Sequence, residues 1–375
     1  MIYFDNAATT KPCSEAVEAV MKGLELFGNP SSLHGMGVEA ECLINRARSS
    51  IAGSLGAADE EIYFTSCATE SSNTAIFGIA RTIGKRKKRI VTTSVEHPSV
   101  QVCCDELEKQ GFEIVRVTPG EDGKISAEDI IAAVNDNTCL VSCMLVNNET
   151  GRILPVEKAF RAIKRRFPQT VTHCDCVQGY LKIPVKVKKL YADIISLSGH
   201  KIHAPKGIGA MYIKKGVRVP AFMYGGGQEK GFRSGTECVP LICGFGAAAE
   251  KYADTIGERF EKAAALRNYL FEKCGENGIH VNSDTECSPY ISSIAVDGYK
   301  SEVLLHFLEQ RGIYVSSGSA CSKGKKSSVI REFGIAEKYQ DSTLRVSFSE
   351  ENTAQEIDSL IEALKSARQK LCGTR

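Results

Sequence analysis

The chain has 375 residues, of which 43% are hydrophobic and 25% are charged, and its formal net charge is +2 at pH 7. This composition is typical of a globular protein with a sizeable core, and the length predicts two or three domains, or one large and one small domain. The near-neutral charge gives no support for nucleic-acid binding, and no apolar run approaches the roughly 18 residues that span a bilayer. The start, MIYFDNAATTKP, lacks the basic and apolar segments of a signal peptide, so we expect a cytoplasmic protein.

The first 215 residues alternate between helix-like and strand-like segments. Apolar residues recur every three or four positions in residues 15–27 and 39–56, as in amphipathic helices, and Ser126 is a candidate N-cap for a further helix. The predicted strands, several of them apolar almost throughout, are 61–66, 89–94, 113–118, 139–146, 170–175, 193–198 and 209–214. This alternation predicts an α/β fold with a mostly parallel sheet that helices cover on both faces.

The pattern changes after about residue 245. A long helical stretch from Gly246 to about Cys274 is followed by shorter strand-like and helix-like segments, and the chain closes with the amphipathic segment AQEIDSLIEALKSARQKL. These features predict a smaller α+β domain. We assign residues 13–250 to a large domain, and residues 1–12 together with 251–375 to the small one.

Polar residues follow the predicted strands at the points where the strands end. They are Thr69, His97, Asn148, Asp175, Gln178, His200 and Lys201. In open α/β sheets, ligands bind at the carboxyl ends of the strands. A solvated aspartate, a core histidine, a helix N-cap or a lysine that reaches the surface explains any one of these residues, but explains the whole set poorly.

Pyridoxal phosphate (PLP) requires such a set. It needs a lysine that binds its aldehyde, a carboxylate beside its ring nitrogen, an anion site for its phosphate and a planar group against its ring. Lys201, Asp175, the helix that begins near Thr69, and His97 match these needs in that order. Asp175 lies about one strand–crossover–strand unit before Lys201, so the two strand ends can be neighbours.

Nine short motifs occur along the chain in this order: YFDNAATT, GNPSSLHGMG, FTSCATESSN, VEHPSV, VNNETG, DCVQ, SGHKIHAPKGIGA, GGGQEKGFRSGT and SSGSAC. Through these motifs, nearly the whole chain resembles the NifS/IscS-type cysteine desulfurases of the class V aminotransferase group. The resemblance implies the PLP-dependent transferase fold of type I, with a seven-stranded, mostly parallel sheet between helices and a smaller α+β domain. It also implies a homodimeric enzyme that takes sulfur from L-cysteine and contains no metal site.

The resemblance further implies roles for individual residues. The implied cofactor-binding residues are Ala68, Thr69, His97, Asn148, Asp175, Gln178, Ser198, His200, Lys201 and Thr236. Of these, Thr236 would reach a phosphate across the dimer interface, and His97 would stack on the ring and carry protons. Asn148 and Arg345 would bind the substrate carboxylate, a task that suits the fork of an arginine.

One of the fifteen cysteines, Cys321, has surroundings that favour a reactive thiolate. It lies in GSACSKGKKSS, where Gly and Ser surround it and three lysines follow it, so we predict an exposed, electropositive loop and a nucleophilic cysteine. The other reading, a buried structural cysteine, fits so polar a stretch less well. No C-x-x-C pair exists, and most of the other cysteines are expected to be small buried hydrophobes.

The chain departs from the family pattern at three places. Cys67 stands where glycine is usual, and Tyr224 precedes GGG where histidine is common. The loop after Cys321 is shorter and more basic than in relatives dedicated to iron–sulfur assembly. The sulfur acceptor is therefore left open between an iron–sulfur scaffold and a tRNA-thiolating sulfurtransferase.

The predicted reaction converts L-cysteine to L-alanine, with Lys201, Cys321 and His97 as catalytic residues and a persulfide that passes to the acceptor. A selenocysteine lyase or another class V aminotransferase is the alternative with the same cofactor, and the Cys321 loop distinguishes them because an aminotransferase needs no such nucleophile. A non-enzymatic sulfur carrier is a third reading. The set Lys201, Asp175 and His97 argues against it.

Overall fold

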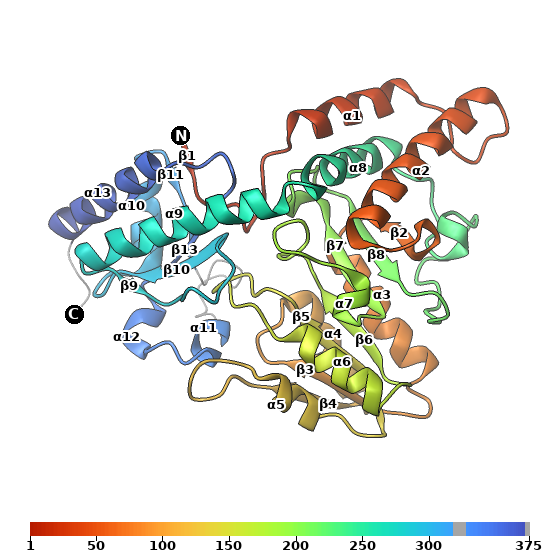
Figure 1. The fold of residues 1–375 in the computed structure, drawn as a ribbon, viewed down its shortest axis with the longest axis horizontal. Helices are drawn as coiled ribbons and strands as arrows, with labels where there is room; N and C mark the ends of the chain where they lie inside the picture. Colours follow the sequence, from red (N-terminus) through yellow and green to blue (C-terminus); the bar gives the residue numbers. More distant parts are fainter. Residues whose placement is uncertain (318–327, 372–375) are drawn as a thin grey trace.

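The computed structural model describes residues 1–317 and 328–371. Its larger sheet has seven strands in the order β2-β8-β7-β6-β5-β3-β4 (Figure 1). They are β2 (Ile62–Thr65), β3 (Arg89–Thr93), β4 (Glu113–Val117), β5 (Thr138–Met144), β6 (Val171–Asp175), β7 (Ile194–Ser198) and β8 (Gly209–Ile213). All neighbours pair in parallel except β8, which is antiparallel to both β2 and β7. The predicted strands and the mostly parallel sheet are confirmed.

Helices cover both faces of this sheet, because successive residues of a strand point to opposite sides. On β7, Ile194 belongs to the core formed with α3 and α4, whereas Ile195 belongs to the core on the other face, to which α2, α6 and α8 contribute. The helices of this part are α1 (Ser14–Glu25), α2 (Gly35–Leu55), α3 (Ala68–Thr82), α4 (Pro98–Lys109), α5 (Ala127–Ala132), α6 (Val156–Arg166), α7 (Val187–Leu190) and α8 (Val239–Ala253). Ser126 caps α5 as predicted, since its Oγ accepts a hydrogen bond from the Asp129 N–H at 3.0 Å.

A second, antiparallel sheet has the order β12-β13-β10-β9 and a core of its own. Its strands are β9 (His280–Val281), β10 (Ile291–Ala295), β12 (Ser316–Ser317) and β13 (Thr343–Ser347), and β1 (Ile2–Tyr3) pairs separately with β11 (Ile313–Tyr314). The remaining helices are α9 (Ile256–Glu276), α10 (Ser301–Glu309), α11 (Ser328–Glu332), α12 (Glu337–Gln340) and α13 (Ala354–Lys370). The domain boundaries expected from the sequence stay a prediction.

The helical stretch predicted from Gly246 to about Cys274 consists of two helices, because the chain breaks between α8 and α9 at Asp254 and Thr255. The side chains of Asp and Thr compete for backbone hydrogen bonds and favour helix ends. The break also lets the two helices follow different surfaces. Helix α8 packs against α1 and α2 in the core of the large sheet, whereas α9 runs on to the second core (Figure 1).

The N-terminal segment after β1 joins the two sheets beside the carboxyl ends of β6 and β7. The Ala7 N–H donates to Ser347 Oγ on β13 at 2.8 Å, and the Thr10 N–H donates to the His200 carbonyl at 2.9 Å. This segment therefore places backbone carbonyls next to the residues that follow β7. Within residues 1–317 and 328–371, no helix is both long and apolar enough to span a membrane.

A buried ion pair fixes the loop that carries Thr236. Arg48 on α2 donates to both carboxylate oxygens of Glu229, at 2.7 and 2.9 Å, and Glu229 also accepts the Phe64 N–H at 2.8 Å. Both side chains of the ion pair are at least nine-tenths buried. Glu229 and Lys230 have φ values of 47° and 59°, a left-handed conformation that non-glycine residues adopt only when their surroundings hold them.

Arg48→Met should therefore lower the free energy of unfolding by about 3 kcal/mol or more, because Glu229 would stay buried without its cation. Urea denaturation checks this. Arg46→Met on the same helix is the control: Arg46 pairs with Glu250 in solvent, and its loss should cost less than about 1 kcal/mol. Equal effects of the two substitutions would contradict a structural role for the buried pair.

Candidate active site

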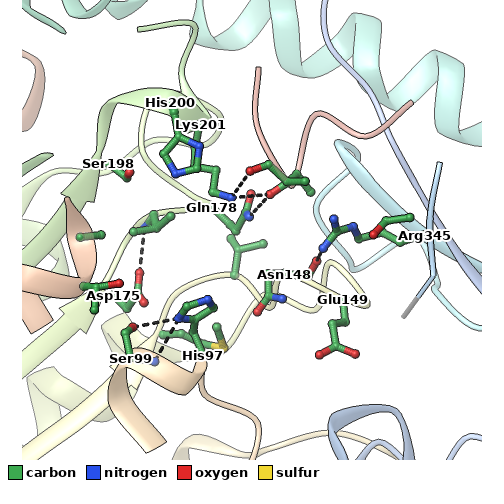
Figure 2. A pocket seen from close by; sticks show the side chains of 18 of the residues that line it. His97, Ser99, Asn148, Glu149, Asp175, Gln178, Ser198, His200, Lys201 and Arg345 are labelled. Atoms are coloured by element: carbon green, nitrogen blue, oxygen red, sulfur yellow. Dashed lines mark hydrogen bonds between the residues drawn. The ribbon is translucent and has the colours of Figure 1, made fainter. Parts of the chain in front are cut away.

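A cavity of about 430 Å³ lies at the carboxyl ends of the large sheet, beside the second sheet (Figure 2). Among its lining residues are these site residues predicted from the sequence: Ala68, Thr69, His97, Asn148, Asp175, Gln178, Ser198, His200, Lys201 and Arg345. Thr236 is exposed and lines a separate pocket, together with Ser66 and Glu229. Cys321 lies outside the described residues.

Lys201 ends a short 3₁₀ turn, Gly199–Lys201, that follows β7. Its Nζ donates to the carbonyls of Ala7 and Ala8 at 2.7 and 2.6 Å. The amine therefore points into the cavity and away from the surface, and the N-terminal segment supplies the acceptors that stabilise it there (Figure 2). A lysine held in this way is suited to covalent or proton-transfer chemistry.

Asp175 is the last residue of β6 and is buried, with 5% of its surface exposed. Burial raises the pKa of its carboxyl group above the ordinary value, and the Val177 N–H, at 2.9 Å from Oδ1, together with the nearby His97 and Lys201 side chains opposes this shift. A carboxylate with so little solvation favours a cation as its neighbour. It can thus stabilise a protonated ring nitrogen placed against it.

His97 caps the N-terminus of α4 and faces the same cavity. Its Nδ1 accepts the Ser99 N–H at 3.1 Å, so the neutral imidazole carries its proton on Nε2. Burial lowers the pKa of His97, and Lys201 lowers it further, whereas Asp175 raises it. The cavity therefore contains a planar, neutral ring at pH 7 that can stack on a flat ligand.

A candidate anion site lies where α3 begins. Among the described residues, the side chain of the N-cap, Cys67, makes no cap bond, which leaves the first-turn N–H groups as possible donors to a ligand. Ser198 Oγ is buried and has no hydrogen-bond partner among the described residues. A Cβ on Gly209 would lie 2.8 Å from the Cys67 carbonyl carbon, so glycine is needed where β8 passes this turn. These donors fit a phosphate and, together with Lys201 and Asp175, they fit PLP.

The opposite side of the cavity comes from the second sheet. Arg345 on β13 donates from Nη1 to the Asn148 carbonyl and from Nη2 to Asp5 Oδ1, both at 2.9 Å. Its Nε is buried without a hydrogen-bond partner in the described part of the chain. The guanidinium is therefore held in a fixed orientation and still has a donor to offer to a carboxylate.

The sequence analysis missed several residues of the cavity, among them Asp5, Ser99 and Glu149. Asp5 lies in the motif YFDNAATT, which contributes to the family resemblance, but the motif alone indicates no role for the Asp5 carboxylate. Ser99 follows His97 by two residues, the spacing at which a capping histidine meets a backbone N–H. The carbonyls of Ala7 and Ala8 have no side-chain signal that could have revealed them.

Comparison with known proteins places the chain in a family. The model of the class V aminotransferases matches residues 2–360. The chain belongs to this family. A cysteine desulfurase of Trichormus azollae is 39% identical over 99% of this chain and 94% of that protein. A solved NifS-like protein superposes with a TM-score of 0.94 at 36% identity, covering 99% of this chain and 100% of that one.

A third relative is known with a ligand. The structure described as SspA in complex with cysteine has a TM-score of 0.82 and 32% identity, and the match covers 94% of this chain and 100% of that one. Within the class V aminotransferases, the chain is thus a NifS-type cysteine desulfurase, a PLP-dependent enzyme of fold type I. The cofactor that the donor set fits is the cofactor of the family.

Ser198→Ala should weaken PLP binding to the cofactor-free protein by about ten- to a hundredfold, because the phosphate loses a charge-assisted hydrogen bond of about 1.5–3 kcal/mol. Fluorescence titration with PLP measures this. Ser94→Ala is the control, since the Ser94 hydroxyl is also buried without a partner among the described residues but does not line the cavity. Equal affinities of the wild type and both variants for PLP would show that Ser198 is not part of the anion site.

Proposed function

We propose that the enzyme converts L-cysteine to L-alanine and transfers the sulfur, through a persulfide on Cys321, to an acceptor protein. The observation that carries this proposal is the convergence of Lys201, Asp175 and Arg345 on one cavity. An amine, a buried carboxylate and a guanidinium suit an amino acid that is bound by its carboxylate and loses a Cα proton. The relatives named cysteine desulfurase and the solved relative in complex with cysteine support cysteine as the substrate.

The residues of the cavity have separate roles in the proposed reaction. PLP, when bound, supplies the electron sink for the Cα–H bond that breaks. Lys201 Nζ, oriented by the Ala7 and Ala8 carbonyls, takes that proton and can return it. The carboxylate of Asp175 stabilises positive charge on the ring, and Arg345 and Asn148 bind the substrate carboxylate.

The sulfur step balances without an external oxidant. The thiolate of Cys321 attacks the substrate sulfur, an S–S bond forms and the S–Cβ bond breaks. The electron pair of that bond stays on the substrate carbon, which is then protonated to give alanine. The neutral His97 imidazole faces the cavity and is the candidate for carrying this proton.

A homodimer is part of the proposal. On α1, the side chains of Val17, Met21 and Leu24 are 48%, 54% and 58% exposed, and Leu33 before α2 is 98% exposed. This spacing places the helical residues in one apolar stripe, of a kind that a second copy of the chain would cover. In such a dimer, we expect Thr236 to serve the site of the neighbouring subunit.

The acceptor is an iron–sulfur scaffold or a tRNA-thiolating sulfurtransferase, and the basic residues after Cys321 favour a dedicated partner over a general one. The cytoplasmic location stays a prediction. A selenocysteine lyase or a different class V aminotransferase is the second candidate, and the requirement for Cys321 distinguishes it from a desulfurase.

Lys201→Ala should abolish formation of alanine from cysteine, because the covalent anchor of the cofactor and the base for the Cα proton are both lost. Amino-acid analysis of the reaction mixture measures this. Lys206→Ala, an exposed lysine five residues later, should retain activity. Turnover by the Lys201 variant at the wild-type rate would rule out the PLP mechanism.

The Cys321→Ser variant should bind cysteine, because Lys201, Asp175 and the phosphate-binding residues are unchanged. It should form neither alanine nor persulfide. A serine hydroxyl without an adjacent base is a poor nucleophile near pH 7. Peptide mass spectrometry of cysteine-treated wild-type enzyme should find one extra sulfur on the peptide that contains Cys321. Alanine formation by the serine variant at full rate would favour the lyase candidate.

A further inference from the structure

Lys182 is a lysine that the mechanism above does not use, and it is buried with only 4% of its surface exposed. It follows Gln178 by four residues, and its Nζ lies 5.9 Å from the centroid of the Tyr290 ring. No carboxylate in the described ranges lies within ion-pair distance of it. Burial of an ammonium group without a counter-ion costs several kcal/mol, so a lysine here lowers the stability of the fold.

A chain of hydrogen bonds connects Lys182 to the cavity. Its Nζ donates to Gln178 Oε1 at 3.2 Å, and Gln178 Nε2 donates to the Ala7 carbonyl at 2.9 Å. The same carbonyl accepts from Lys201 Nζ at 2.7 Å (Figure 2). An ammonium group can only donate, so the amide oxygen of Gln178 must face Lys182 and the amide nitrogen must face the cavity side.

The electrostatic surroundings of Lys182 are mostly positive. Its pKa is lowered to about 7, chiefly by burial and also by Lys201, Arg259 and Arg345, while Glu350 opposes this shift. Glu350 is itself engaged by His203 and Arg259, at 3.4 and 3.3 Å. The ammonium form is therefore less favoured than in an ordinary lysine, and an anion in the cavity would favour it.

We propose that Lys182 is a positioning residue for the cofactor: it fixes the Gln178 amide as a hydrogen-bond donor toward the cavity and adds a buried positive charge that favours an anionic ligand. This inference rests on the PLP site described above. It explains why a destabilising lysine lies next to a residue that lines that site.

The test uses the full-length, cofactor-free protein and PLP as the probe. In Lys182→Met, the dissociation constant of PLP should rise about tenfold or more, and the absorption maximum of the bound cofactor should shift because the amide is no longer oriented. The thermal midpoint of the cofactor-free variant should equal or exceed that of the wild type, because an unpaired buried charge is gone. A merely structural lysine would instead lower that midpoint.

Lys186→Met is the matched control. Lys186 belongs to the same segment, but it is exposed and donates to the Ser54 carbonyl at 2.8 Å, away from the cavity. Its affinity for PLP and its absorption maximum should match the wild type. Lys182→Gln, which keeps a donor and loses the charge, should retain the absorption maximum while its affinity falls.

Two results would overturn the proposal. One is wild-type affinity and an unshifted absorption maximum in Lys182→Met. The other is a fall in the thermal midpoint together with unchanged affinity. Failure of the wild-type protein to bind PLP would instead overturn the cofactor site itself, so the two failures are distinguishable.

Discussion

The charge of Asp175, buried at the end of a central strand, is the constraint on which the rest of the site depends. Strand β6 lies between β5 and β7 and is buried at every residue, so the carboxylate is solvated poorly and is stabilised by the Val177 N–H and by the nearby Lys201. Because β3, β5, β6 and β7 run in parallel, His97 and Lys201 reach the same edge of the sheet. In the function we propose, a cationic ring nitrogen bound against it would offset the energetic cost of burying this charge.

The two ends of the chain supply further parts of the cavity beside the large sheet. The N-terminal segment gives Lys201 two carbonyl acceptors, and β13 gives the cavity Arg345, whose guanidinium is held by Asp5 and the Asn148 carbonyl. The cavity lies between two sheets with separate cores. In the function we propose, the large sheet would position the cofactor and the second sheet would bind the substrate carboxylate.

Apolar runs made the large sheet predictable from the sequence. The residues at the strand ends made most of the cavity predictable, because the carboxyl ends of parallel strands meet at one edge of a sheet. The break at Asp254 was not predictable from periodicity, since the apolar residues continue through it, and the antiparallel direction of β8 depends on long-range packing. The Ala7 carbonyl, 194 positions from Lys201, has no sequence signature at all. Lys182 had a signal that was overlooked: a single lysine within the otherwise apolar run GYLKIPV.

The central claim is that PLP binds covalently to Lys201 at the carboxyl edge of the sheet. Borohydride reduction of the PLP-loaded enzyme, followed by proteolysis and peptide mass spectrometry, locates the lysine that carries the cofactor. The account predicts one pyridoxyl group, on the peptide that contains Lys201. A pyridoxyl group on Lys182 or Lys206, or none on any lysine, would contradict it.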